Sequence, residues 1–452
     1  MTHAGPSEFR VEQRHYRGLY LNREVHESSK IYLYFTAAFI AKIFLSAMTP
    51  LSSDFLANVS FTEFSWRNVL ASGFYAPWYG VMKSITSLWA LLPMEHPSLN
   101  SSIGFWYVTP NVSIMTLLMM QKAPLLIFDA ATALVIGRIV ATHRSPHLAQ
   151  QAVLLWLINP YVTLTTEMFG TWDIVSAFFL LVAVWMFAKG RFLESGVSLG
   201  LGIAAKMYPL LALPIFLMFL TREKVKSTLR FAVGTLGTYS IVGALPMILG
   251  AGHRGSVETL AELAYVGGNV WGYTLNSTAV YTVGISVLVV ASILFTLGFF
   301  VLWEPRRTSI LEAVLCLYLL VFAFSYWETQ FLLNLLPLLT IYYFVAERRN
   351  PPFFAYVSSA LAFVLLDFGY YYASWGHSFF FIPNYNQVFQ HYSNLLLFIR
   401  QWPIGGGDVS TLLTSPVRSI FVAVSLYYSA WIFLRNTDKQ LLRRILGGAF
   451  VN

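Results

Sequence analysis

Residues 156–219 read WLINPYVTLTTEMFGTWDIVSAFFLLVAVWMFAKGRFLESGVSLGLGIAAKMYPLLALPIFLMF, and this stretch decides the fold class. Apolar runs at 173–188, 192–206 and 208–221 follow one another and are separated by short breaks. A run of roughly 20 mostly apolar residues is long enough to cross a bilayer as a helix. The stretch therefore predicts consecutive membrane helices, of which the last two are short and meet at Lys206–Pro209.

The composition of the whole chain points the same way. Of its 452 residues, 57% are hydrophobic, 17% are aromatic and 11% are charged, whereas an average soluble domain is about 25% charged. A soluble core could not hide this much apolar surface, because most residues of a globule touch its surface. A water-soluble enzyme, a disordered chain and a disulfide scaffold are excluded, and the single cysteine, Cys316, rules out an internal disulfide.

The predicted fold is an all-α polytopic membrane protein of about twelve transmembrane helices, within a range of roughly 10 to 13. Residues 1–452 are expected to form a single integral-membrane domain, because no segment reads as a separate soluble domain. The predicted spans are 31–50, 122–142, 148–168, 173–188, 192–206, 208–221, 229–250, 278–303, 309–327, 329–346, 353–375 and 415–435.

Basic residues predict the orientation of these spans, because cytoplasmic segments carry an excess of lysine and arginine. With residues 1–30 as a cytoplasmic tail, the inner segments hold 21 of the 29 lysines and arginines. Both termini are then cytoplasmic, and the two longest connecting segments, 51–121 and 376–414, lie outside the cytoplasm. The net charge of +8 therefore reflects topology and does not indicate a nucleic-acid surface.

The first outer segment is too long for a simple connector, and it contains an amphipathic stretch at 76–92. Lys83 lies off its apolar face, and the residues that recur at helical spacing on that face are Trp78, Val81, Met82, Ile85, Leu88, Trp89 and Leu92. This pattern predicts a helix in the membrane interface, with its aromatic rings at the depth of the lipid headgroups. A helix packed on the end of the bundle would show the same pattern.

Some ionisable residues lie in or near predicted spans, where burying a charge in the membrane costs free energy. Lys206 departs from the positive-inside pattern, and with Tyr208 it occupies a turn near the outer interface. Such a cation is suited to bind an anionic headgroup or phosphate, and a lysine that extends along apolar surface to reach water is the alternative. Lys42, Asp129 and Asp367 fall inside predicted spans, and we expect Lys42 to pair with one of the two aspartates.

Carboxylates on the outer side are candidates for chemistry on a hydroxyl group. Asp54 follows the first span by four residues and can act as a general base, although a helix cap or a solvated loop acid would look the same. Asp173 opens a helix, where capping and the helix dipole favour a carboxylate, and Gly170 allows a tight turn before it. Three more candidates stand at the outer end of the ninth span: Trp327, Glu328 and Gln330.

Two blocks of the sequence resemble the membrane-embedded GT-C glycosyltransferases. The nearest branches are glycosyltransferase family 87, which uses polyprenyl-phosphomannose, and the GPI mannosyltransferase I family. The first block has an Asn-Pro pair, a Gly-x-x-Asp turn, a small-residue span and a Lys-x-Tyr-Pro end, here Asn159–Pro160, Gly170–Asp173, Gly196–Ala205 and Lys206–Pro209. The second block, WETQFLLNLLPLL at 327–339, is similar to a late segment of these families.

The resemblance implies an inverting enzyme that moves a hexose, most commonly mannose, from a polyprenyl- or dolichyl-phosphate sugar to a lipid-linked or glycan acceptor on the extracytoplasmic face. It implies a catalytic acid in the first outer loop, where Asp54 is the residue that fits. Lys206 would bind the donor phosphate, with Tyr208 as a hydrogen-bond donor. The residues expected to hold the sugar or the acceptor are Glu63, Asp173, Trp327, Glu328 and Gln330.

Several questions stay open at this point. Asp54 is not part of an Asp-x-Asp pair, so a divalent cation is neither required nor excluded, and a lone carboxylate suffices for base catalysis. No motif for another cofactor is present. The membrane would be the plasma membrane of a prokaryote or the endoplasmic reticulum of a eukaryote. A transporter or flippase of lipid-linked sugars and a non-catalytic subunit of a glycan-assembly complex are the alternative functions.

Overall fold

The computed structural model of the protein describes residues 33–47, 49, 55, 59, 61–63, 66, 76–99, 111–221, 223–246, 248, 309–324, 331–346, 352–371 and 409–436. Within these ranges the secondary structure is helical and contains no strand, which confirms the all-α prediction. The helices are Leu33–Ala47, α4 (Ala76–Trp89), α6 (Val112–His143), α7 (Pro146–Leu157), α8 (Pro160–Val162), α9 (Asp173–Ala188), α10 (Phe192–Ala205), α11 (Leu213–Leu220), α12 (Val225–Tyr239), α16 (Ile310–Phe324), α17 (Leu336–Val345), α18 (Pro352–Tyr371) and α20 (Val409–Asn436).

Shorter helical turns connect several of these helices. The turns are η1 (Phe61–Glu63), η3 (Thr163–Met168), η4 (Tyr208–Ala212), η5 (Ser240–Ala244) and η6 (Phe331–Asn334).

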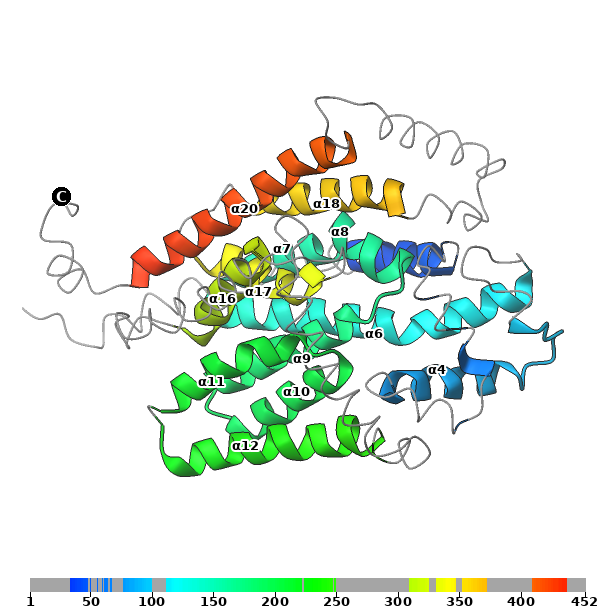
Figure 1. The fold of residues 1–452 in the computed structure, drawn as a ribbon, viewed down its shortest axis with the longest axis horizontal. Coiled ribbons are helices and arrows are strands. Elements are labelled where there is room, and N and C mark those ends of the chain that lie inside the picture. Colours follow the sequence, from blue (N-terminus) through cyan, green and yellow to red (C-terminus); the bar gives the residue numbers. More distant parts are fainter. Residues whose placement is uncertain are drawn as a thin grey trace, which may run out of the picture.

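The long helix α6 runs through the middle of the molecule (Figure 1). Helices α9, α10 and α12 pack in succession on one side of it, and α4 lies against it near its N-terminal part. Helices α7 and α17 contact α6 from the other side, and α18 and α20 form an outer pair beyond them. The candidate site lies where the first residue of α9 meets the residue after α10, next to the turn η3 that contacts the N-terminal half of α6.

Helix α6 is longer than predicted, because its first turns contain polar residues that lower the hydropathy of that part. The Asn111 side chain accepts a hydrogen bond from the Ile114 amide at 2.8 Å and caps the helix. Gln121 and Lys122 follow within the helix and are buried. The whole helix has 32 residues, which corresponds to a length of about 48 Å.

Only part of the predicted membrane topology is supported by the structure. By length and composition, α6 qualifies among the described residues as a helix that could cross a membrane, and several other apolar helices there have 10–17 residues. The count of twelve spans and the side on which each terminus lies stay predictions. The predicted span 278–303 and residues 376–408 of the predicted loop lie outside the described residues, whereas residues 409–414 of that loop are the first residues of α20.

The predicted span 148–168 is wrong as a single helix, because the chain breaks at Asn159–Pro160. Helix α7 ends at Leu157, and Asn159 Oδ1 then accepts hydrogen bonds from the amides of Tyr161 and Val162. This capping starts a new helix, in which Pro160 lacks only an amide that would be unpaired in any case. The new helix widens at once into the π-helical turn η3, which carries Glu167.

Helices α10 and α12 approach more closely than side chains would allow. An added Cβ on Gly196 would lie 2.2 Å from the Phe231 carbonyl oxygen, and one on Gly234 would lie 2.5 Å from the Leu193 carbonyl oxygen. Glycine at these positions therefore lets the two backbones touch, as small residues do between membrane helices.

The predicted helix at 76–92 is present as α4, and only part of its predicted apolar face is turned into the protein, because Val81 and Leu88 of that face are 43% and 57% exposed. Trp78, Met82 and Trp89 are buried, and the Trp89 indole donates a hydrogen bond to the Ser113 carbonyl at 2.9 Å. Gln121 of α6 donates to the Met82 carbonyl at 2.8 Å. The alternative of a packed helix therefore accounts for both tryptophans, and contact of α4 with the membrane interface stays a prediction.

Candidate active site

Lys206 and Asp173 meet at one end of the helix pair α9 and α10. Asp173 is the first residue of α9, and Lys206 directly follows the last residue of α10 in an extended conformation. The Lys206 ammonium lies 2.8 Å from Asp173 Oδ2. The Asp173 side chain is fully buried, whereas 20% of the Lys206 side chain is exposed. Asp173 therefore holds the Lys206 ammonium in place from inside the protein, and the ammonium itself is partly accessible from outside.

The predicted break at Lys206–Pro209 is confirmed and holds Lys206 at this end. Helix α10 stops at Ala205, and the chain continues as the 3₁₀ turn η4, with Pro209 in its first turn. The hydroxyl of Tyr318 donates a hydrogen bond to the Tyr208 carbonyl at 2.7 Å, which fixes this turn to α16. The Tyr208 ring centroid lies 5.6 Å from the Lys206 ammonium, within reach of a cation–π contact.

The two sequence blocks that resemble GT-C glycosyltransferases pack against each other. Ser176, in the first turn of α9, donates a hydrogen bond to Asn334 Oδ1 of η6 at 2.7 Å, and both side chains are buried. This bond joins residues that are 158 positions apart in the chain. It fixes η6, which follows the Trp-Glu-Thr-Gln segment in sequence, beside the helix that begins with Asp173.

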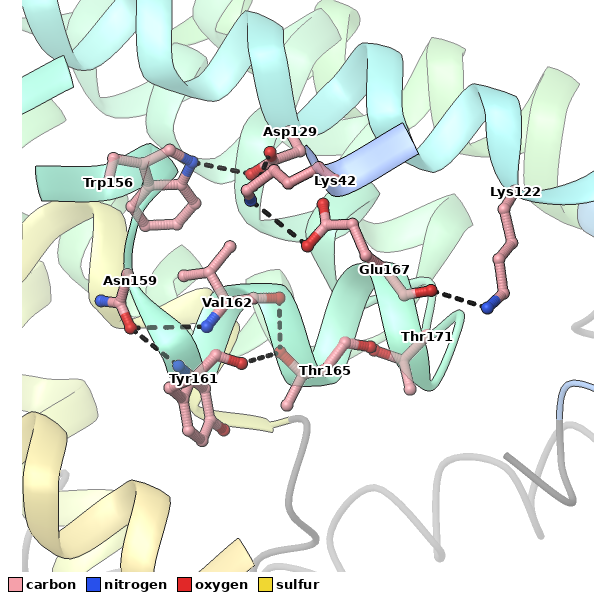
Figure 2. Close-up of polar contacts among 10 residues, drawn as sticks. All are labelled: Lys42, Lys122, Asp129, Trp156, Asn159, Tyr161, Val162, Thr165, Glu167 and Thr171. Atoms are coloured by element: carbon pink, nitrogen blue, oxygen red, sulfur yellow. Dashed lines mark hydrogen bonds and ion pairs between the residues drawn. The ribbon is translucent and has the colours of Figure 1, made fainter. Parts of the chain in front are cut away.

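A second charge cluster, which is fully buried, includes Glu167 of the turn η3 (Figure 2). The Lys42 ammonium, from the helix Leu33–Ala47, lies 2.8 Å from Asp129 Oδ2 of α6 and 3.2 Å from Glu167 Oε2 of η3. The Trp156 indole donates to the other Asp129 oxygen at 2.8 Å. The predicted pairing of Lys42 with an intramembrane aspartate is confirmed, and the role of Glu167 was not predicted.

Lys122 is a buried cation that binds backbone rather than a carboxylate. Its ammonium donates to the carbonyls of Thr49 at 2.8 Å, Glu167 at 2.6 Å and Met168 at 3.0 Å. These bonds join the end of the first described helix to the turn that leads to Asp173. The only sequence signal for this role is a lysine in an otherwise apolar helix, because carbonyl partners leave no pattern in the sequence.

Gly170 makes the turn between η3 and α9 possible. Its φ of +71° is favourable only for glycine, as the tight-turn prediction required. An added Cβ would lie 2.9 Å from the Phe55 ring and 3.2 Å from Lys122 Cε. The Phe55 ring is buried and its centroid lies 5.3 Å from the Lys122 ammonium. Phe55 is therefore packed into the same corner as Lys122 and Gly170.

We expect Gly170→Ala to lower the free energy of unfolding by about 1–3 kcal/mol through backbone strain and by more through the contact with Phe55. Gly190→Ala is the matched control, because Gly190 has the same φ of +71° but open space around its Cβ position. Thermal unfolding of both variants in detergent measures the difference. A Gly170→Ala variant as stable as Gly190→Ala would contradict the close packing of Phe55.

The remaining predicted site residues are only partly placed. Glu63 is exposed, and its carboxylate accepts hydrogen bonds from the Ser98 hydroxyl at 3.2 Å and from the Leu99 amide. It thus lies against the loop at 98–99, whereas Asp173 and Lys206 contact each other. Four predicted residues lie outside the described part of the chain: Asp54, Trp327, Glu328 and Gln330.

A metal centre was left open by the sequence. In the part of the chain that the structure describes, no group of three or more histidine, cysteine, aspartate or glutamate side chains could hold a metal ion. The pair of Asp173 and Lys206 instead offers a cation for an anionic ligand. The corner in which Phe55, Lys122 and Gly170 pack lies at the turn that leads to Asp173.

Comparison with known proteins gives one relevant similarity. No family model matches the chain. Over 100 residues the chain is 35% identical to a GPI mannosyltransferase 1 of Kluyveromyces lactis. That protein is a mannosyltransferase. The match covers 21% of this chain and 24% of the relative, so the chain spans about a quarter of the length of the curated relative it matches.

Proposed function

We propose that the protein is an integral-membrane glycosyltransferase that moves a hexose, in the first instance mannose, from a polyprenyl- or dolichyl-phosphate sugar to a lipid-linked or glycan acceptor. The observation that carries the proposal is the 35% identity over 100 residues to a mannosyltransferase. The apolar composition and the partly exposed cation at Lys206 support it, because the donor phosphate of such a lipid lies at the membrane interface.

In this proposal, Lys206 binds the leaving phosphate. Its ammonium is partly exposed, and Asp173 holds it from behind at 2.8 Å. As the bond between the sugar and the phosphate breaks, negative charge grows on the phosphate oxygen, and a nearby cation stabilises that charge. Asp173 is then a positioning residue as well as a candidate for holding a sugar hydroxyl, and Tyr208 flanks the cation with its ring.

The base in this proposal is Asp54. It accepts the proton of the acceptor hydroxyl, whose oxygen attacks the anomeric carbon, while the phosphate leaves with the electron pair of the broken bond and the configuration inverts. Asp54 directly precedes Phe55, whose ring packs beside Gly170 and Lys122. Because Asp54 is bonded to Phe55, the packing of Phe55 at this turn supports Asp54 as a base close to Asp173.

The sugar and the acceptor would be held by polar residues of both sequence blocks. Trp327, Glu328 and Gln330 precede η6, which Ser176 and Asn334 hold against α9. Glu63, on the same outer segment as Asp54, is the remaining candidate. The transfer can proceed with or without a divalent cation, and the rate of transfer in the presence of a chelator distinguishes the two, because only a metal-assisted reaction loses activity.

The experiment uses the purified full-length chain in lipid, labelled polyprenyl- or dolichyl-phosphate mannose and a lipid extract from the source organism. A labelled product made by the wild type supports a glycosyltransferase. If mannose, glucose, galactose and arabinose donors all fail, the enzyme proposal is wrong.

A transporter of lipid-linked sugars is the second candidate, and the buried charges at Lys42, Asp129 and Glu167 favour it. Ionisable groups inside membrane proteins often mark the route of a substrate or ion. Movement of a labelled lipid-linked sugar across a vesicle membrane without formation of a new glycosidic bond would support that function.

Lys206→Ala is expected to weaken donor binding and transfer together. Loss of a charge-assisted hydrogen bond to a phosphate corresponds to roughly 1.5–3 kcal/mol, or about 10- to 150-fold. Binding of the labelled donor in detergent and the rate of transfer measure both effects. Lys189→Ala is the matched control, since Lys189 follows the other end of α9 and lies 4.2 Å over the Trp185 ring. Unchanged donor binding by Lys206→Ala would exclude the phosphate role.

A further inference from the structure

We propose that a groove between α7, α17 and α18 binds the acyl chain of an anionic phospholipid, whose phosphate lies at Arg144. The groove has a volume of about 490 Å³, which is within the range of roughly 300–1,000 Å³ of small-ligand sites. Its walls are mainly apolar and come from Leu148, Leu155, Ile158, Tyr343, Phe344 and Phe354. This site is separate from Lys206 and Asp173 and depends only on the location of the protein in a membrane.

The length of the groove matches one leaflet of a bilayer. Leu148 and Ile158 both line it and are ten residues apart along and just beyond α7, a rise of about 15 Å. The hydrocarbon core of a bilayer is about 30 Å thick, so one leaflet accounts for about half of that. Ile158 and Phe354 are also 56% and 54% exposed, which leaves apolar surface for a lipid chain to cover.

A positive charge stands at one end of this apolar wall. Arg144 follows α6, and its guanidinium donates two hydrogen bonds to the Val345 carbonyl, at 2.7 Å from Nη2 and 3.2 Å from Nε. These bonds fix the guanidinium where α6 and α17 end. A guanidinium carries five N–H donors in a planar fork that suits phosphate oxygens, so this anchoring leaves donors for a ligand.

The charge of Arg144 favours an anionic lipid over a zwitterionic one, because only the anionic headgroup brings a net negative charge to the guanidinium. Gln151, the other polar residue of the wall, is bonded to His147 at 3.0 Å on the same helix. Basic residues between membrane helices commonly bind the headgroups of anionic lipids. The apolar groove next to Arg144 would then hold the acyl chain.

The test measures lipid binding to the purified full-length chain by native mass spectrometry in detergent. The probes are phosphatidylglycerol and phosphatidylcholine with identical acyl chains. We expect phosphatidylglycerol to bind at least about fivefold more tightly, the effect of one basic residue near a lipid phosphate. Equal binding of the two lipids would overturn the proposal, and so would binding of neither.

Four variants separate charge recognition from a general change in structure. Arg144→Gln is expected to reduce phosphatidylglycerol binding about fivefold, to the level of phosphatidylcholine. Arg144→Lys keeps the charge and is expected to retain the preference, and Gln151→Trp fills the groove and is expected to weaken both lipids. Arg191→Gln, which alters an exposed arginine paired with Glu194, is the control and should bind as the wild type does.

Three outcomes contradict the site itself. If Arg144→Gln binds phosphatidylglycerol as the wild type does, Arg144 does not contact the headgroup. If Arg144→Lys loses as much binding as Arg144→Gln, the effect comes from the lost bonds to Val345, and charge recognition is wrong. A phosphatidylglycerol with a photoreactive acyl chain should also label peptides that contain Leu155 or Tyr343, and labelling confined to other helices would contradict the groove.

Discussion

Asp54→Asn is expected to abolish most sugar transfer, by a factor of roughly 10² to 10⁴, because an amide cannot accept the proton of the acceptor hydroxyl. The substitution changes little volume, so donor binding should stay close to that of the wild type. The loss should therefore appear in the turnover number and not in the Michaelis constant for the donor. Initial rates with labelled polyprenyl- or dolichyl-phosphate mannose measure both.

A matched control distinguishes loss of the base from a general change in the first outer segment. Glu95 is an exposed acid of the same predicted segment, and Glu95→Gln should transfer sugar within about twofold of the wild type, as surface substitutions usually do. If Asp54→Asn also keeps its rate, the enzyme class stands and the base lies elsewhere. Glu63 is then the next residue to replace.

Lys42→Met is expected to lower the free energy of unfolding by about 3–5 kcal/mol, because it leaves buried carboxylates without their cation. Asp129 and Glu167 both bind the Lys42 ammonium, and all three side chains are at most 2% exposed. Thermal or denaturant-induced unfolding of the purified chain in detergent measures the loss. The exposed pair of Arg191 and Glu194 is the control, and Arg191→Gln should cost under about 1 kcal/mol.

Neutralising the carboxylates tests the electrostatic origin of that loss. In the triple variant Lys42→Met, Asp129→Asn, Glu167→Gln no charge of this cluster remains. We expect it to be more stable than Lys42→Met alone, because groups in one buried network are not additive. A triple variant that is less stable than the single one would show that packing, and not the unpaired charges, determines the stability of this region.

The fold could be predicted from sequence where hydropathy alone determines the structure. Helices α9 and α10 begin and end within one residue of their predicted limits, because charged or turn-forming residues bound both apolar runs. The start of α6 was predicted ten residues too late, since Lys122 and Gln121 lower the local hydropathy although both are buried. The break at Asn159 was missed because its cause is a side-chain hydrogen bond and not a change in hydropathy.

The candidate site was predictable as separate residues but not as an arrangement. Lys206 stood out as a cation at the outer interface and Asp173 as a helix-opening acid, yet their contact across 33 positions required the structure. Lys42 was expected to pair with Asp129 or Asp367 because an unpaired charge in a predicted span is costly, and the structure shows that its partner is Asp129. Glu167 lies at the end of the predicted span 148–168, and the π-helical turn brings its carboxylate to Lys42.

The backbone contact between α10 and α12 limits how the protein can move. Gly196 and Gly234 place carbonyl groups of one helix where a Cβ of the other would be, so neither helix can slide or rotate without a clash. A hinge within this pair is therefore excluded, and the two helices must travel as a single rigid body. Because Lys206 directly follows α10, the position of its ammonium is set by this rigid pair and not by α10 alone.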